Sequence, residues 1–350
     1  MRKLLNSLYV TTPEAYLSKD GQNVVVSNHG NELFRIPIQN LESICTYGYQ
    51  GASPGLMKLC VDNKVGLTFF SPHGRFIARI QGPVSGNVLL RTQQYALFKD
   101  DSTRLHLASI AIAAKIYNSR VVLRRFVRDY PDSTYVQEVA DKADKLYNRC
   151  RKVRAAQSLE ELRGVEGESA SIYFSAFPHL ILKKDKSFVF NARNRRPPTD
   201  PVNAMLSLGY SLLAADCGSA LEGVGLDPAV GFMHALRPGR QSLALDLMEE
   251  LRAYVVDRLV LSMINTRQIV PTDFLVHRSI DNETGELAVI LTDDGRKKFL
   301  AAWQNKKKTE LLHPFLKEKV QVGLLPHIQA MLLARYLRND LDDYPAFFAK

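Results

Sequence analysis

The sequence predicts an α+β protein, in which a β-rich N-terminal domain, residues 1–92, precedes a larger all-α domain, residues 93–350. Two observations predict this division. Up to about residue 90 the chain is rich in Val, Ile, Phe, Tyr and Thr, with turn signals such as KDG, NHGNE and SPHG between the apolar segments. Beyond that point apolar residues recur with the period of about 3.6 that is typical of helices. With 350 residues and 46% hydrophobic content, the chain is long enough for two cores.

Short apolar segments in the first 92 residues, NVVVS, LFRIPI and VGLTFFS, indicate strands. One helix is expected among them, over residues 53–63. Ser53 can cap its first turn and Pro54 takes the first helical position, where a missing N–H costs nothing. The N-terminal domain is therefore predicted to contain strands with one short helix.

The remainder of the chain is predicted to be mainly helical. The longest regular pattern covers residues 102–130. Ser158 and Glu161 form an S-x-x-E capping box, which marks the start of the helix that contains GVEGES. A short β excursion is expected at SFVFNAR, and Pro197 and Pro198 break the chain before another helix.

Composition excludes several classes of protein. The four cysteines are far apart and have no C-x-x-C spacing, so neither a disulfide framework nor a zinc knuckle is predicted. We find no apolar run of the roughly 18–20 residues that a membrane span needs, and no signal-peptide pattern at the N-terminus, so we expect a cytoplasmic protein. The net charge of +10 favours a polyanionic partner such as nucleic acid.

The segment from residue 242 to about residue 264 has helical periodicity, with apolar residues on one side. Four acidic residues fall on the other side: Asp246, Glu249, Glu250 and Asp257. The simplest interpretation is an amphipathic helix with a solvated acidic face, because such faces are common.

The alternative interpretation is a metal site. His234 lies just before the loop RPGR, so a short connection can bring its imidazole near the start of the acidic face. Glu166 stands between Gly164 and Gly167, and because each glycine weakens a helix by about 1 kcal/mol, the pair predicts crowding by a neighbouring helix or a ligand. One histidine with two or more carboxylates suits Mg²⁺ or Mn²⁺, which would polarise a phosphodiester.

Basic residues form a second constellation. Between residues 183 and 196 the chain has one acid, Asp185, among these basic residues: Lys183, Lys184, Lys186, Arg193, Arg195 and Arg196. Arg237 and Arg240 lie beside the proposed metal helix. Such residues suit contacts with DNA phosphates, although a solvated basic loop is the alternative, above all for the lysines. In RNRRPP the prolines fix the path of the arginines ahead of a helix.

Two rival functions use the same residues. HALR, from His234 to Arg237, is an H-x-x-R that would suit a tyrosine recombinase, in which histidine and arginines clamp a phosphate while a tyrosine attacks. That interpretation leaves Glu166 and the acidic face without a role. A non-catalytic DNA-binding scaffold is the other alternative. No phosphate-binding G-x-x-x-x-G-K-[ST] or G-x-G-x-x-G is present.

Four ordered blocks resemble the signature of the CRISPR-associated endonuclease and integrase that captures new spacers. They are GVEGESASIYF, RNRRPPTDPVNAMLSLGYSLL, GLDPAVGFMH and QSLALDLMEELRAYVVDRLV. The opening LLNSLYVTTPEAYLSKDG and the GASPGLM block are similar to the N-terminal half of the same family, so the resemblance covers essentially the whole chain.

The resemblance implies a β domain joined to a helical catalytic domain, and a homodimer in which the β domain is expected to form the interface. It also implies a small ferredoxin-like partner subunit and DNA as substrate. In this family a Glu, a His and an acidic residue on the following helix bind the metal, which corresponds here to Glu166, His234 and Glu249. Many relatives have Asp at the position of Glu249, whose longer side chain keeps the same ligand chemistry. Asp246 is then a fourth ligand or an orienting group, and Glu250 faces the same side by periodicity.

Overall fold

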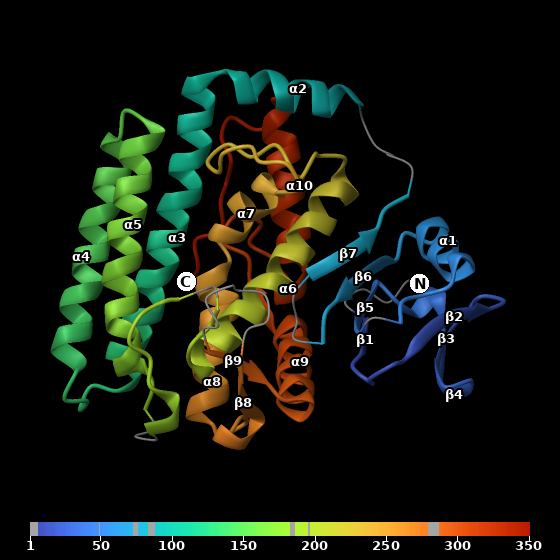
Figure 1. The fold of residues 1–350 in the computed structure, drawn as a ribbon. Coiled ribbons are helices and arrows are strands. Elements are labelled where there is room, and N and C mark those ends of the chain that lie inside the picture. The colour runs from blue at the N-terminus through green and yellow to red at the C-terminus, as the bar shows by residue number, and fades with distance from the viewer. Residues whose placement is uncertain are drawn as a thin grey trace.

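The computed structural model describes residues 6–48, 50–72, 76–82, 88–182, 186–194, 197–278 and 287–350. Figure 1 shows a strand-rich N-terminal part beside a larger helical part. This arrangement confirms the predicted α+β class. Four residues of the predicted basic segment, Lys183, Lys184, Arg195 and Arg196, lie outside the described residues.

The N-terminal part contains two sheets. The first has the strand order β1-β5-β6-β7, in which β1 (Ser7–Val10), β5 (Ser43–Tyr47) and β6 (Gly66–Phe70) are parallel and β7 (Phe76–Ile80) is antiparallel. The second is an antiparallel meander of β2 (Tyr16–Asp20), β3 (Asn23–Asn28) and β4 (Asn31–Pro37), followed by a 3₁₀ turn at Ile38–Asn40. Leu17, Val24, Ile44, Leu56 and Leu67 are fully buried in a shared core.

The short helix expected in this part is α1 (Pro54–Asp62). The Ser53 hydroxyl accepts a hydrogen bond from the Leu56 amide at 3.2 Å, and Pro54 begins the helix. Both predicted roles are confirmed, because the side-chain oxygen satisfies an amide that has no partner inside the first turn.

From residue 88 onward helices dominate. They are α2 (Val88–Lys99), α3 (Asp101–Asp129), α4 (Val136–Ala155), α5 (Leu159–Ala176), α6 (Pro201–Val224), α7 (Ser242–Glu249), α8 (Arg258–Asn265), α9 (Asp293–Lys308) and α10 (Leu325–Leu337). Short 3₁₀ turns lie at Phe177–Leu180, Lys186–Phe188, Pro271–Asp273 and Val322–Leu324, and a π-helical turn at Ala253–Asp257. Figure 1 shows α3, α4 and α5 as one layer, with α6, α7 and α10 beside it.

Two predictions for the second part of the chain are wrong: that it is all-α, and that it has a strand at SFVFNAR. Two antiparallel strand pairs occur in the second part: β8 (Phe274–Arg278) with β9 (Leu287–Leu291), and β10 (Glu310–Leu312) with β11 (Lys319–Gln321). The expected β excursion at SFVFNAR is instead the 3₁₀ turn at Lys186–Phe188 followed by irregular chain. Its two phenylalanines are buried, and the Phe190 ring packs against the rings of Phe174 and Phe177.

Helix α6 forms the centre of the helical part. Asp200 caps it by accepting from the Asn203 amide at 2.8 Å, and Pro201 is its first residue. By length and composition alone this helix could cross a membrane, which our search for apolar runs missed, but 67% of its apolar window is buried inside the fold. At Gly209 an added Cβ would lie 2.5 Å from a Val256 methyl, so glycine lets α6 approach the π-helical turn.

Candidate metal centre

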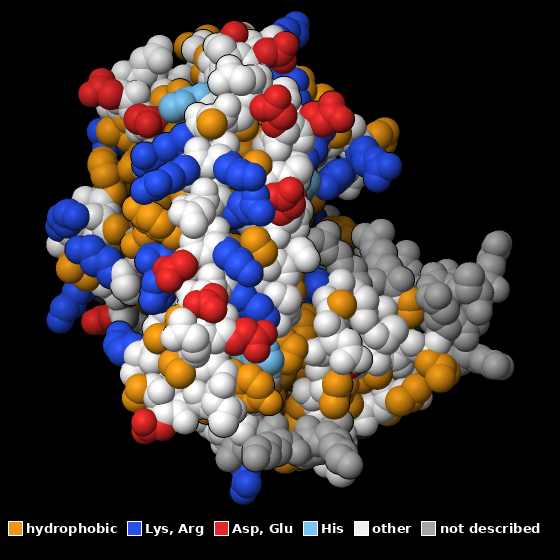
Figure 2. All heavy atoms as spheres, turned by 90° about the vertical axis from the view of Figure 1, so that its left-hand side faces the viewer, with side chains coloured by type: hydrophobic (Ala, Val, Ile, Leu, Met, Phe, Trp, Pro, Cys, Tyr) orange, Lys and Arg blue, Asp and Glu red, His pale blue; other side chains and the backbone are white. Residues whose placement is uncertain are grey.

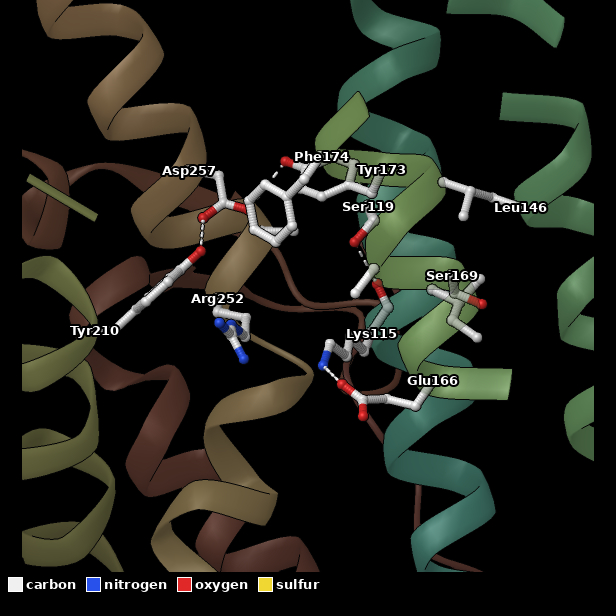
Figure 3. A pocket seen from close by; sticks show the side chains of 13 residues that line it. Lys115, Ser119, Leu146, Glu166, Ser169, Tyr173, Phe174, Tyr210, Arg252 and Asp257 are labelled. Carbon is white, nitrogen blue, oxygen red and sulfur yellow. Dashed lines mark hydrogen bonds and ion pairs between the residues drawn. The ribbon is translucent and has the colours of Figure 1, made fainter. Parts of the chain in front are cut away.

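Three helices bring a lysine and two glutamates together. Lys115 lies on α3, Glu166 on α5 and Glu249 at the end of α7. The Lys115 ammonium forms ion pairs with both carboxylates, contacting Glu166 through Oε1 and Glu249 Oε2 at 2.8 Å. Figure 3 shows the Lys115 and Glu166 side chains pointing toward each other from neighbouring helices. Glu166 on α5 and Glu249 on α7 thus lie on either side of Lys115, a residue that the sequence patterns did not indicate.

The position of Glu166 follows from the start of α5. The Ser158 hydroxyl accepts from the Glu161 amide at 3.2 Å, as the capping box predicts. The returning bond is displaced by one residue, because the Glu161 carboxylate accepts from the Gln157 amide at 2.8 Å and not from the Ser158 amide. This cap fixes the first turn, and Glu166 follows two turns later.

Glu249 is buried between two cations. Besides Lys115, the Arg252 guanidinium Nη1 donates to Glu249 Oε1 at 2.8 Å and Oε2 at 3.0 Å. Burial raises the pKa of Glu249, but the charges of Arg252 and Lys115 outweigh that effect and hold it well below its usual value. The Arg252 guanidinium also lies 4.2 Å from the centre of the Tyr210 ring, which fixes its orientation.

Asp246 makes all its contacts within the protein. Its Oδ2 accepts from the amides of Phe232 at 2.6 Å and Met233 at 3.0 Å, and its Oδ1 accepts from the His234 amide at 3.1 Å. Oδ1 also lies 2.6 Å from His234 Nδ1. Because an ionised carboxylate only accepts, Nδ1 must carry the proton, which leaves a free lone pair on Nε2. Asp246 thus orients His234.

The loop that carries His234 depends on a glycine. A Cβ added to Gly231 would lie 2.6 Å from Asp246 Oδ2 and 2.6 Å from the Ser242 carbonyl carbon. Only glycine lets the loop backbone come close enough for its successive amides to reach the carboxylate. The GFMH pattern is therefore explained by packing around Asp246.

The solvated acidic face predicted for residues 242–264 is wrong. Asp246, Glu249, Glu250 and Asp257 are all buried. The segment is also not one helix, since α7 ends at Glu249 and the π-helical turn intervenes before α8. A π-helical turn inserts an extra residue and shifts the register of the side chains that follow. Each carboxylate instead finds donors on other elements.

Two of these carboxylates are bound by residues outside the candidate metal centre. Glu250 accepts from the Tyr344 hydroxyl and the Phe347 amide, and it does not share the side of Glu249 that periodicity predicted. Asp257 accepts from the hydroxyls of Tyr173 at 2.9 Å and Tyr210 at 2.5 Å. Glu250 is therefore committed to the C-terminal segment and Asp257 to the helical core.

The predicted crowding around Glu166 by a neighbouring helix is also wrong. A Cβ added at Gly164 or at Gly167 would meet nothing within 4 Å. The surface of α5 on either side of Glu166 is open in the part of the chain that the structure describes, and the Glu166 side chain is 25% exposed. This opening gives access to the carboxylate from outside.

The arginines that were predicted to contact DNA phosphates differ in their surroundings. The Arg193 guanidinium donates to Asn203 Oδ1 at 2.7 Å and Ser207 Oγ at 3.1 Å, so it braces α6 and is not turned to solvent. Arg237 is exposed and Arg240 half-buried, in a turn closed by a 3.0 Å bond from the Arg240 amide to the Arg237 carbonyl. These two remain available for phosphate contacts.

A basic surface that the sequence analysis did not single out lies on α4. The helix has six lysines and arginines against three acids. Figure 2 shows the face of the molecule on this side, where Lys and Arg side chains are spread along the surface with fewer acidic ones between them. Such a surface attracts a polyanion.

The donor set fits a hard divalent ion. Among the residues that the structure describes, no group of three or more His, Cys, Asp and Glu side chains is already arranged to hold a metal, since Lys115 lies between the two glutamates. Yet both carboxylates already converge on one cation, and Asp246, which holds the His234 imidazole, lies one turn before Glu249 on α7. Two carboxylates and an oriented imidazole suit Mg²⁺ or Mn²⁺.

Comparisons with known proteins agree over the whole chain. Residues 8–305 match the family model described as CRISPR associated protein Cas1. The chain is 48% identical over 354 residues to a CRISPR-associated endonuclease Cas1 of Rhodospirillum rubrum, with all of both chains covered. It is 47% identical over 347 residues to a CRISPR-associated endonuclease Cas1 of Chlorobaculum tepidum, covering 99% of each. A solved structure of a casposase bound to integration product is similar at a TM-score of 0.82 and 25% identity, covering 97% of this chain and 94% of that one.

Proposed function

The chain belongs to the Cas1 family of CRISPR-associated proteins, and on this premise we propose that it is a metal-dependent DNA endonuclease and integrase. It inserts short fragments of foreign DNA into a CRISPR array by transesterification. Relatives named as endonucleases and a similar casposase bound to integration product support a nuclease and integrase role. The observation that carries the proposal is the convergence of Glu166 and Glu249 on one cation. His234 is held by Asp246, which lies one turn before Glu249 on α7.

In this proposal Glu166, Glu249 and His234 Nε2 would hold a Mg²⁺ or Mn²⁺ ion. Such an ion would stabilise charge at the phosphate and lower the pKa of the attacking hydroxyl or water. Asp246 keeps His234 in the tautomer whose Nε2 is unprotonated, and Arg252 fixes one side of Glu249. Arg237 and Arg240 contact DNA phosphates and position the substrate.

The reaction needs no nucleophile from the protein. A 3′-hydroxyl of the incoming fragment attacks a phosphodiester at the repeat boundary, so that one phosphorus–oxygen bond forms while another breaks. Water in place of that hydroxyl gives the nuclease activity. The protein orients the reacting groups and balances charge, which accounts for a site made of carboxylates, cations and one imidazole.

We propose double-stranded DNA, a second copy of the chain and a small ferredoxin-like subunit as partners. The net charge of +10 and the basic surface of α4 support the DNA partner. The dimer and the small subunit follow from the family resemblance, with the β-rich part as the proposed dimer interface.

The recombinase alternative has less support. It would use His234 and Arg237 as a phosphate clamp and a tyrosine as nucleophile, but the tyrosines that line the cavity beside Glu166 are Tyr173 and Tyr210. Both are buried and donate to Asp257, and burial raises the pKa of each well above its usual value. A phenol that is harder to ionise is a weaker nucleophile.

An integration assay on labelled DNA tests the proposal. The wild type is compared with Glu166→Ala and His234→Ala, each with Mn²⁺ and with excess EDTA. Strand joining and cleavage are expected only in wild type with metal. Glu168→Ala is the matched control, because Glu168 lies on the same helix with an exposed side chain paired to Arg149, and it should keep full activity.

Each rival predicts a different result. Strand joining that persists in His234→Ala with metal contradicts the metal site. A covalent phosphotyrosine adduct formed in EDTA supports the recombinase. Binding that falls steeply with salt, without metal-dependent turnover, supports the non-catalytic scaffold.

A further inference from the structure

Lys115 lies where two proposed metal ligands meet, and the proposed function gives it no role. We propose that Lys115 is a built-in counter-cation that competes with the divalent ion for Glu166 and Glu249. It neutralises the two carboxylates in the metal-free protein and weakens metal binding. This inference rests on the proposed function, since it assumes that the ion binds to these two carboxylates.

The first argument is the burial of the charges. The Lys115 side chain is 11% exposed and the Glu249 side chain 6%. A buried carboxylate without a counter-charge is strongly destabilising, because water no longer solvates it. Arg252 compensates Glu249 alone, whereas Lys115 contacts Glu249 and Glu166 together. Lys115 is thus the group that allows Glu166 and Glu249 to approach each other without metal.

The second argument is the occupation of the carboxylate oxygens. Glu249 Oε1 accepts from Arg252, and its Oε2 is shared between Arg252 at 3.0 Å and Lys115 at 2.8 Å. Glu166 Oε1 is taken by Lys115. An ion that binds both glutamates must therefore displace the ammonium or repel it at short range. Arg252 is the less mobile cation, because its Nη1 donates to both oxygens of Glu249 and its guanidinium lies over the Tyr210 ring.

The third argument is that Lys115 has somewhere to move. A cavity of about 40 Å³ adjoins it, with Glu166, Ser169 and Arg252 also in its wall. This volume holds a few water molecules. Figure 3 shows Lys115 and Glu166 on one side of this space and Ser119, Tyr173 and Asp257 on the other. The flexible four-carbon stem of lysine lets the ammonium withdraw without movement of α3.

Calorimetric titration with Mn²⁺ alone, on protein stripped with EDTA and desalted, tests the competition. Lys115→Met removes the charge and keeps the length of the stem. Its dissociation constant for Mn²⁺ is expected to fall by at least about tenfold, because no ammonium must be displaced, while the melting temperature of the metal-free protein falls. Lys115→Arg, which keeps the charge, should bind Mn²⁺ no more tightly than wild type.

Lys298→Met is the matched control. Lys298 pairs with the buried Asp273 at 2.7 Å, outside the proposed site. This variant should lose thermal stability and keep the Mn²⁺ affinity of wild type. An unchanged or weaker Mn²⁺ affinity in folded Lys115→Met overturns the proposal, since it means that Lys115 supports the ligands and does not compete with the ion.

Failure of the proposed function itself gives a different pattern. Wild type would then bind no Mn²⁺, or would bind it equally well in Glu166→Ala and His234→Ala. If Lys115→Met alone does not fold, Lys115→Met combined with Glu166→Gln tests the charge balance. The double variant should recover folding, because one carboxylate charge is removed with the lysine, and failure to recover it contradicts the counter-cation role.

Discussion

Asp246 holds His234 through both its imidazole and its backbone amide, and two further amides complete the shell of the carboxylate. Four donors at 2.6 to 3.1 Å leave little reason for this side chain to turn toward a metal. Of the two roles predicted for Asp246, we therefore favour that of a group that orients His234 over that of a fourth metal ligand. Its influence on chemistry passes through the Nδ1 proton of His234.

Asp246→Asn tests this role. The amide can still fill the space, but only its carbonyl oxygen accepts, so its NH₂ group faces N–H donors on the side of His234 or of the loop amides. The affinity for Mn²⁺ is expected to fall about 10–100-fold, as for other groups that orient a metal ligand. In a His234→Ala background the same change should have no further effect on Mn²⁺ affinity. Additive losses in the double variant would show that Asp246 acts independently of His234, as a direct ligand would.

Lys306 on α9 shows how charges on neighbouring helices change the pKa of a single side chain. Its ammonium lies 4.9 Å from the centre of the Tyr254 ring, which the Arg258 guanidinium also approaches at 4.5 Å. Burial, with the charges of Arg258 and Arg125, lowers the pKa of Lys306 from 10.5 to about 8. Arg125 on α3 and Arg258 on α8 thus place like charges near Lys306 on α9.

Protein stability should respond to this packing. Between pH values of about 8 and 10.5 the unfolded chain binds more protons at Lys306 than the folded one, so this group makes stability rise with pH in that window. Lys306→Met is expected to raise the melting temperature at pH 7 and to reduce the rise above pH 8. Lys308→Met, exposed on the same helix, is the control and should change neither. A lower melting temperature at pH 7 in Lys306→Met would contradict the argument.

Periodicity and capping predicted the elements whose causes are local. The cap at Ser53, the long helix α3 and the Ser158 cap of α5 all depend on residues within a turn or two of each other. The prediction of a solvated acidic face was wrong, because helical periodicity separates two sides of a helix but does not show which side is buried. The partners that bury Asp257 and Glu250 lie on α5, α6 and the C-terminal segment, far away in sequence.

The candidate site, like the fold, was predicted only in part from the sequence. Glu166 and His234 stood out because glycines and a loop surround them, and the family resemblance joined them to Glu249. Lys115 and Arg252 were missed, although a lysine inside the apolar run IAIAAKI is a usable signal of a buried charge. Which acid such a lysine meets depends on helix packing that no local pattern encodes.

At the scale of the whole molecule, hydrogen bonds connect residues 344–349 to α3 and to the end of α7. Asn118 on α3 donates to the carbonyls of Glu250 at 2.6 Å and Phe347 at 2.7 Å, and it accepts from the Ala349 amide at 2.8 Å. The Phe347 ring packs edge-on against the Tyr254 ring. One buried amide thus joins α3, the end of α7 and the C-terminal segment.

Asn118→Ala should therefore loosen several elements together. It leaves two carbonyls and one amide buried without partners, for which we expect a loss of about 3 kcal/mol in the free energy of unfolding. Urea unfolding followed by circular dichroism measures the loss. Asn63→Ala, which removes one half-buried bond to the Leu59 carbonyl in α1, is expected to cost less. An equal cost for both would mean that the C-terminal segment contributes little to stability.

The contact between Gly231 and Asp246 also limits how this loop can vary. Because a side chain at position 231 would collide both with the carboxylate and with the start of α7, substitution there moves His234 even though residue 231 performs no chemistry. Positions 235–238, which are exposed, have no such restriction. The loop thus divides into a stretch with almost no freedom of sequence and a neighbouring stretch whose side chains can change without moving His234.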